Sequence, residues 1–163
     1  LAISSAASDV YKRQALVQGH CYTGSLELAL SCDLLIAGDS AKFSDTHGKW
    51  GLSPTWGMTQ RLPRRIGLLQ AKELMFSGRV VQGEEAVKIG LANQCVPDSS
   101  LLESGLKMAK SFLENSWFTL RADKMLINGG LDHNLQEGLI WERENSPGRG
   151  PEMSERIANF GKT

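Results

Sequence analysis

The sequence has few cysteines and no cysteine pattern that would place it in a specialised class. Its 163 residues include only Cys21, Cys32 and Cys95, and no C-x-x-C pair. An odd count without metal-ligand spacing argues against a disulfide framework and a zinc site, and is typical of a reducing compartment. We therefore expect no bound metal and a cytoplasmic location, with an organelle matrix as the alternative.

An excess of charge of one sign and a long hydrophobic run are also absent. The 18 Lys and Arg residues balance the 18 Asp and Glu residues, so the chain lacks the basic excess expected of a nucleic-acid-binding protein. No apolar run reaches the roughly 18 residues that a membrane-spanning helix needs. Hydrophobic residues nevertheless make up 41% of the chain, which is enough for a folded core. We expect neither a nucleic-acid partner nor a membrane partner.

The first 14 residues, LAISSAASDVYKRQ, differ in character from the rest. They are rich in Ser and Ala and then charged, with no helical or strand period. The basic pair follows the small residues, which is the reverse of the order in a signal peptide. This pattern predicts that residues 1–14 are a non-native or disordered leader.

Short apolar patterns after the leader predict a β-α-β unit. The apolar run at 15–19 ends at a glycine, as the end of a buried strand does. Apolar residues then recur at helical spacing over 26–32, and two strand-like segments follow at 33–38 and 41–45. Strand, helix and strand in close succession favour an α/β fold.

The second half of the sequence is mostly helical in pattern. From residue 58 onward apolar residues recur at spacings of three and four, apart from one strand-like segment at 91–96. The sequence therefore predicts an α/β core over residues 15–98, followed by a helical C-terminal region over residues 99–163.

The segment around Gly24 and Glu27 is the strongest candidate for chemistry. A helix is expected to begin near Gly24, and the first N–H groups of a helix have no partner inside it. Gly24 has no Cβ, so an oxygen atom of a ligand can approach its N–H closely, as in an oxyanion hole. Glu27 follows three residues later on the same face. Its position also fits a helix-capping glutamate, and the spacing alone leaves both interpretations open.

Three stretches of the sequence resemble the enoyl-CoA hydratase/isomerase family of the crotonase superfamily. They are ALVQGHCYTGSLELALSCDLLIAGDSAKF, GLSPTWGMTQRLPRRIG and FSGRVVQGEEAVKIGLANQCVP. The resemblance covers most of this chain but only the later part of a complete family member. It implies the C-terminal part of a crotonase-like β-α-β spiral, followed by a helical region, in a chain truncated at its N-terminus.

The resemblance also implies a function. Family members bind acyl-CoA thioesters, stabilise an enolate-like intermediate through two backbone N–H groups, and assemble as trimers or dimers of trimers. Carried over, Gly24 supplies one of these N–H groups and Glu27 is one of the two acid/base glutamates of the hydratases. The expected activity of the complete protein is hydration of a 2-enoyl-CoA, without a cofactor other than the coenzyme A that the substrate carries. Activity of this segment alone is not expected.

The second acid/base glutamate of the family is replaced here by His47. An imidazole can exchange a proton near neutral pH or orient a water molecule. Alternatively, His47 hydrogen-bonds the loop or lines the pocket. Asp45 either orients His47 or ends a strand. The replaced glutamate leaves double-bond isomerisation and decarboxylation open as alternative reactions.

Further residues match family positions that line the acyl pocket, namely Pro54, Trp56 and Met58, although ordinary loop and core packing explains them equally well. Three arginines at 61, 64 and 65 either attract the phosphates of CoA or form a solvated helix face or an intersubunit ion pair. The alternative from another class is a non-catalytic acyl-CoA-binding or oligomerisation fragment.

Overall fold

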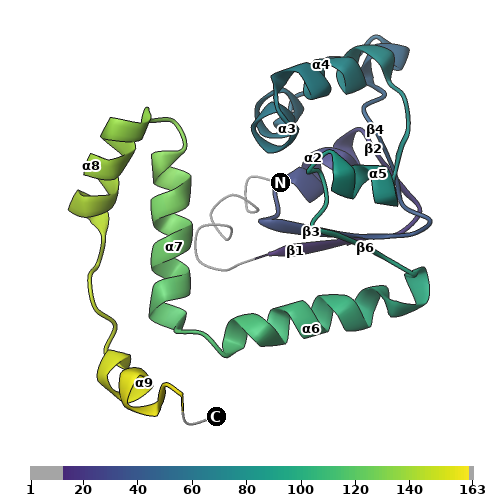
Figure 1. Ribbon diagram of the computed structural model, residues 1–163. Coiled ribbons are helices and arrows are strands. Elements are labelled where there is room, and N and C mark those ends of the chain that lie inside the picture. The colour runs from purple at the N-terminus through teal and green to yellow at the C-terminus, as the bar shows by residue number, and fades with distance from the viewer. Residues whose placement is uncertain (1–12, 162–163) are drawn as a thin grey trace. The chain divides into compact units, whose positions relative to one another are not determined.

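The N-terminal part of the chain is a spiral in which each turn contains two strands joined by a corner (Figure 1). The first turn consists of β1 (Gln14–Val17) and β2 (His20–Tyr22), and the second of β3 (Leu34–Gly38) and β4 (Lys42–Ser44). β3 pairs parallel with β1, and β4 pairs parallel with β2. The predicted β-α-β arrangement is thus confirmed, and β2 is a further strand that the sequence analysis did not predict.

The corner between β1 and β2 depends on a glycine. Gly19 has a φ of 66°, in the left-handed region that glycine enters without a Cβ penalty. Its carbonyl oxygen accepts the N–H of Lys42 at 2.7 Å, and its own N–H donates to Oγ of Ser40 at 3.2 Å. These bonds stack the two corners of successive turns on each other.

Two further strands complete two three-stranded sheets. β6 (Gln94–Val96) pairs parallel with β3, which gives the order β1-β3-β6. β5 (Val81–Gln82) pairs antiparallel with β4, which gives the order β2-β4-β5. The strand predicted at 91–96 is present but shorter.

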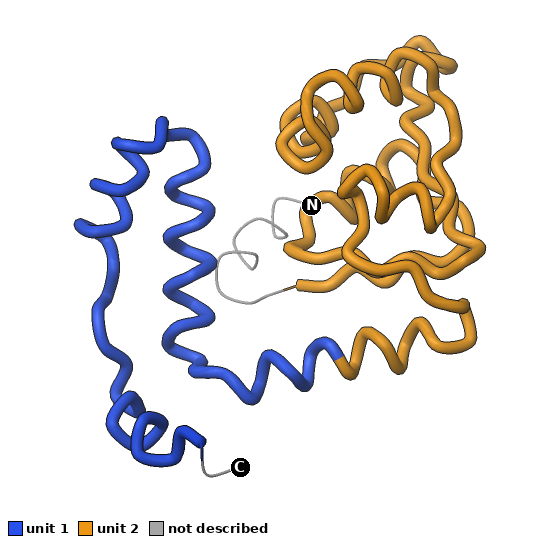
Figure 2. The backbone as a smooth tube through the Cα atoms, in the orientation of Figure 1, with its two compact units in different colours: residues 1–11, 108–163 blue, residues 12–107 orange. Residues whose placement is uncertain are grey.

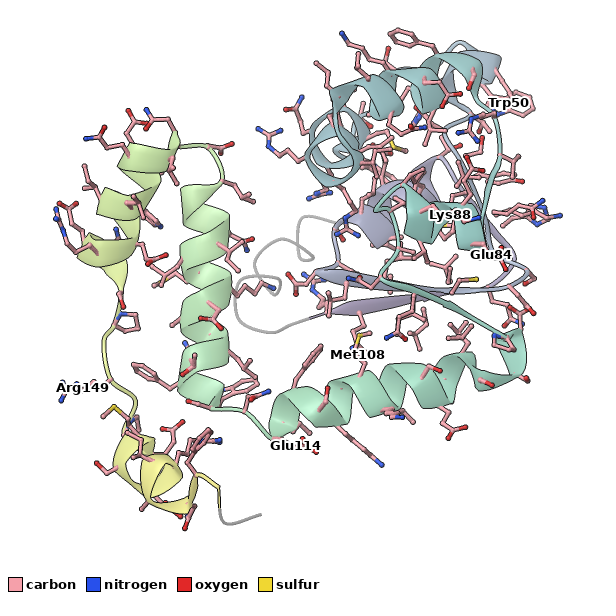
Figure 3. The ribbon with its side chains drawn as sticks, viewed as in Figure 1. Trp50, Glu84, Lys88, Met108, Glu114 and Arg149 are labelled. Carbon is pink, nitrogen blue, oxygen red and sulfur yellow. The ribbon has the colours of Figure 1, made fainter. Side chains whose placement is uncertain are left out.

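Helices connect the strands of this α/β part. In chain order they are α2 (Gly24–Leu30), the 3-10 helix η1 (His47–Trp50), α3 (Met58–Ile66), α4 (Leu68–Ser77), α5 (Gly83–Lys88) and the 3-10 helix η2 (Asp98–Ser100). Trp50, at the end of η1, projects outward and is 73% exposed (Figure 3). The segment between β4 and α3 therefore contains one short helical turn.

The core lies between the strands and α2, α3, α4 and α5. Leu35, Ala37 and Phe43 contribute from the strands, and Met58 and Leu62 from α3, all with at most 1% exposure. Cys21 of β2 belongs to the same cluster, and burial raises the pKa of its thiol to about 11. A thiol in this state is unreactive at neutral pH, so Cys21 is a packing residue.

The structure describes residues 13–161, and they form two compact units (Figure 2). The first ends at Lys107 and the second begins at Met108, so the division falls inside α6 (Leu101–Leu113). The sequence analysis placed the boundary after residue 98, where the last strand and its loop end. Most of the predicted leader lies outside the described residues, but Gln14 already belongs to β1.

The second unit is helical, as predicted for the C-terminal region. It contains α7 (Trp117–Gly130), α8 (Leu135–Asn145) and α9 (Met153–Asn159). The hydroxyl of Ser116 caps α7, and Asn134 forms a capping box with Glu137 at the start of α8. None of the helices within residues 13–161 is long and apolar enough to cross a membrane.

Candidate active site

The turn between β2 and α2 presents Gly24 and has a strained residue next to it. Thr23 has φ 53° and ψ −113°, and it is the only residue other than glycine with a positive φ between residues 13 and 161. Such a conformation is an outlier for a β-branched residue. Two contacts hold it: the N–H of Thr23 donates to the carbonyl oxygen of Ser44 at 3.0 Å, and its hydroxyl is hydrogen-bonded to that of Thr46. The strain fixes the direction in which the following Gly24 N–H points.

This strain leads to a stability prediction for two matched substitutions. Thr23→Ala and Thr23→Gly both remove the hydroxyl, but only glycine adopts the observed φ and ψ freely. We expect Thr23→Gly to be more stable than Thr23→Ala by about 1 kcal/mol, because relief of strain exceeds the extra chain entropy of glycine. Chemical denaturation of both variants measures the difference. The opposite order would mean that the turn relaxes at little cost.

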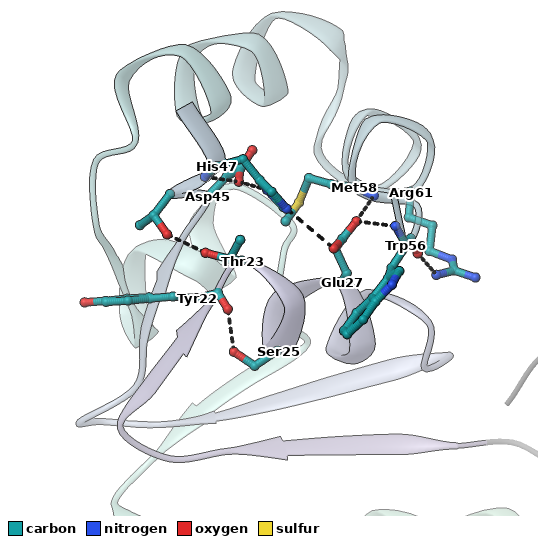
Figure 4. A network of polar contacts seen from close by, with 10 residues as sticks. Tyr22, Thr23, Ser25, Glu27, Asp45, His47, Trp56, Met58 and Arg61 are labelled. Carbon is teal, nitrogen blue, oxygen red and sulfur yellow. Dashed lines mark hydrogen bonds and ion pairs between the residues drawn. The ribbon is translucent and has the colours of Figure 1, made fainter. Parts of the chain in front are cut away.

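Glu27 is buried, and one of its carboxylate oxygens is fixed by the main chain. The residue is 2% exposed on α2. Its Oε1 accepts the backbone N–H of Trp56 at 2.9 Å and that of Met58 at 3.0 Å (Figure 4). At the start of α2 the N-cap residue receives no side-chain hydrogen bond. The capping interpretation of Glu27 is therefore wrong: its carboxylate turns toward the 56–58 segment rather than back to the helix start.

His47 and Asp45 form a second buried pair beside Glu27. Both residues are buried, at 8% and 3% exposure. Oδ1 of Asp45 accepts the backbone N–H of His47 at 3.1 Å and lies 2.5 Å from Nδ1 of the imidazole. Asp45 follows directly on β4, and His47 begins η1. Asp45 therefore does orient His47, which is one of the two roles that the sequence left open.

The other ring nitrogen of His47 faces the free oxygen of Glu27. Nε2 and Oε2 are 3.8 Å apart, beyond the length of a direct hydrogen bond. One small oxygen atom can contact both atoms at this separation, as bridging water does. Figure 4 shows the two side chains pointing toward each other from η1 and α2. Residues that are 20 positions apart thus bring a carboxylate and an imidazole close together.

The segment that anchors Glu27 also places an indole beside Gly24. A Cβ added to Gly24 would lie 3.0 Å from Cζ3 of Trp56, so the ring packs closely against this glycine. Trp56 itself is 50% exposed, whereas the Met58 side chain lies in the core with 0% exposure. Pro54 is half-buried in the same loop. The roles of Pro54, Trp56 and Met58 as acyl-contacting residues stay predictions.

The arginines that follow this segment donate within the chain. Arg61 donates to the carbonyl oxygen of Trp56 at 2.8 Å, Arg64 to that of Gln60 at 3.0 Å, and Arg65 to that of Cys32 at 2.6 Å. Burial lowers the pKa of the Arg65 guanidinium. Each of the three arginines thus hydrogen-bonds a backbone carbonyl group of the chain. The bond from Arg61 holds the segment that carries Trp56.

A cavity of about 490 Å³ lies in the helical unit. Its lining residues come from the start of α7 and from the segment 148–160, and none of the predicted site residues is among them.

Between residues 13 and 161 no group of three or more His, Cys, Asp or Glu side chains is placed to hold a metal ion.

These features together define a class of protein: a β-α-β spiral with a glycine at the start of a helix and a buried carboxylate and imidazole that face each other. The chain belongs to the enoyl-CoA hydratase/isomerase family, whose sequence pattern matches residues 13–148. The resemblance seen in the sequence is thereby confirmed, as is the crotonase-like α/β fold.

Individual relatives agree with this assignment. The chain is 40% identical over 116 residues to a short-chain-enoyl-CoA hydratase of Clostridioides difficile, covering 71% of this chain and 75% of the relative. The enoyl-CoA hydratase structure from Bacillus anthracis is 32% identical, with a TM-score of 0.87, and the match covers 91% of this chain and 58% of that one. A Thermobifida fusca YX structure, described as an enoyl-CoA hydratase in complex with acetoacetyl-CoA, is 27% identical with a TM-score of 0.79, over 94% and 57% of the two chains.

The chain spans about half the length of several other curated relatives that it matches. The assembly into trimers and the cytoplasmic location stay predictions.

Proposed function

We propose that the full-length protein adds water across the C2–C3 double bond of a 2-enoyl-CoA thioester. The observation that carries this proposal is the buried pair of Glu27 Oε2 and His47 Nε2, 3.8 Å apart. This pair lies beside a turn whose first helical residue, Gly24, offers an N–H without a partner inside the helix. Relatives named as hydratases and a family structure with acetoacetyl-CoA support the choice of an acyl-CoA substrate.

The geometry supports different roles for Glu27 and His47: Glu27 transfers the proton, and His47 helps to orient the water molecule. The attacking water lies between Oε2 of Glu27 and Nε2 of His47 and donates one O–H to each. Glu27 takes one proton as the water oxygen bonds to C3, and the electrons of the double bond move to the thioester oxygen. The N–H of Gly24 stabilises the resulting enolate charge. Glu27 then returns the proton to C2, so the net change is addition of H and OH.

The fixed Oε1 is important for this step. Two backbone N–H groups hold it, so the carboxylate cannot rotate to exchange its two oxygens without breaking both bonds. Only Oε2 is presented to the reacting atoms. A base held in this way loses little freedom when the substrate binds, which lowers the barrier of the chemical step.

Double-bond isomerisation is the second candidate, because one specific feature favours it. His47 stands where the resembling hydratases have a second carboxylate, while isomerisation needs only one base to move a proton along the acyl chain. Glu27 is placed to act alone in this way.

An acyl-CoA panel tests the proposal on the full-length protein. We expect loss of the conjugated-enoyl absorbance with short 2-enoyl-CoA substrates and formation of the 3-hydroxyacyl-CoA, identified by mass. Conversion of 3-enoyl-CoA to 2-enoyl-CoA without hydration would favour the isomerase. Saturable binding of acyl-CoA with no turnover on any substrate would mean that the protein is a binding module.

A further inference from the structure

Asp45 contacts His47 at two points, and both contacts bear on where the ring carries its hydrogen. Its Oδ1 accepts the backbone N–H of His47 and lies 2.5 Å from Nδ1. A carboxylate only accepts hydrogen bonds. Nδ1 must therefore be the donor, and the neutral ring then has its lone pair on Nε2.

The opposite side of the ring is the side that faces the chemistry. Nε2 lies 3.8 Å from Oε2 of Glu27, whose other oxygen is held by two backbone N–H groups. In the Nδ1-protonated tautomer, Nε2 and Oε2 are both acceptors, and they face each other across 3.8 Å (Figure 4). A water molecule that contacts both atoms can donate one hydrogen to each and keep its oxygen lone pairs free for attack.

A third contact supports the placement of this loop. Thr46, between Asp45 and His47, is hydrogen-bonded through its hydroxyl to Thr23, which directly precedes Gly24. The segment 45–47 is thereby tied both to the imidazole and to the turn that presents the Gly24 N–H.

We propose that Asp45 is a positioning residue that selects the Nδ1-protonated tautomer of His47 and so makes Nε2 an acceptor for the attacking water. The part of this inference that concerns turnover rests on the hydratase function proposed above; the tautomer itself does not. In the opposite tautomer Nε2–H would donate to the water oxygen, so one of the two water hydrogens would lose its acceptor and one of the two oxygen lone pairs would be taken up by this bond.

The decisive substitution is Asp45→Ala, which removes Oδ1, the one atom that accepts both the backbone N–H of His47 and Nδ1–H. Without an acceptor at Nδ1 we expect the ring to switch to the Nε2-protonated tautomer and hydration to fall by about tenfold or more, because the water is misoriented. In Asp45→Asn the amide oxygen can take the place of Oδ1 and accept both hydrogens, so this conservative variant should keep the original tautomer and part of the rate.

The measurement is the ¹⁵N chemical shift of both ring nitrogens in the histidine-labelled full-length protein, with the ring neutral. The signals of His47 are assigned by their loss in His47→Gln. Asp39→Ala is the matched control, since Asp39 is exposed, accepts the backbone N–H of Asp98 and forms no hydrogen bond with His47. We expect it to change neither the tautomer nor the rate.

Two results would overturn the inference: a wild-type ring protonated at Nε2, or an Asp45→Ala variant that loses activity while keeping the wild-type tautomer. Failure of the proposed function looks different. In that case the wild-type protein does not hydrate any enoyl-CoA, while the tautomer still switches in Asp45→Ala, and the positioning role of Asp45 stands.

Discussion

Glu27→Gln is expected to reduce turnover of the full-length protein about 10²–10⁴-fold, the usual loss when a general acid/base is removed. The structure indicates that this substitution removes proton transfer without disturbing the position of the side chain. A glutamine oxygen can replace Oε1 and keep the two backbone N–H bonds from Trp56 and Met58. The amide nitrogen then occupies the place of Oε2, where it can neither take nor return a proton.

Stability separates the chemical role of Glu27 from its anchoring role. Glu27→Gln should melt close to the wild type. Glu27→Ala leaves two N–H groups without their acceptor and should lose about 2 kcal/mol or more of unfolding free energy. Glu84→Gln, on exposed residue 84 of α5, is the matched control and should change neither quantity. A Glu27→Gln variant with near-wild-type turnover would reduce Glu27 to a structural anchor.

His47→Ala is expected to lower hydration about 10²-fold, because the attacking water loses one of its two acceptors and is no longer oriented toward C3. His20→Ala, on the exposed end of β2, is the matched control. If His47 only lined the pocket, the substitution would instead change which acyl chains bind and leave the rate with the best substrate nearly unaffected.

His47→Glu gives a sharper answer at the same position. It restores the two-carboxylate arrangement of the resembling hydratases. We therefore expect hydration to rise relative to isomerisation on matched short substrates. An unchanged ratio of the two activities, with the fold intact, would show that residue 47 does not choose the reaction.

The main features of the fold could be predicted from the sequence, because they depend on local patterns. The helices over 68–77 and 83–88 contain apolar residues at helical spacing, and the strand over 34–38 is a continuous apolar run. β2 and β5 could not be found in this way, since segments of three and two residues show no period. Their existence depends on pairing with β4.

In the candidate site, too, the features with a local sequence signal could be predicted, and those that depend on distant contacts could not. Gly24, Glu27 and His47 were found through the helix start and the family resemblance, and the structure brings Glu27 and His47 together. The two donors that fix Glu27 lie 29 and 31 residues away and use backbone atoms. No side-chain motif records such a contact. The positive φ of Thr23 was also not predictable, because a threonine in a turn ordinarily indicates a cap and not strain.

The anchoring of Glu27 by main-chain donors has a consequence for how this site can diverge. Every residue except proline carries a backbone N–H, so positions 56 and 58 can change their side chains without removing either bond to the carboxylate. Trp56 is half-exposed and packs against Gly24. On its predicted role in the acyl pocket, a change of this side chain would alter acyl preference while the main chain keeps the Glu27 carboxylate in place.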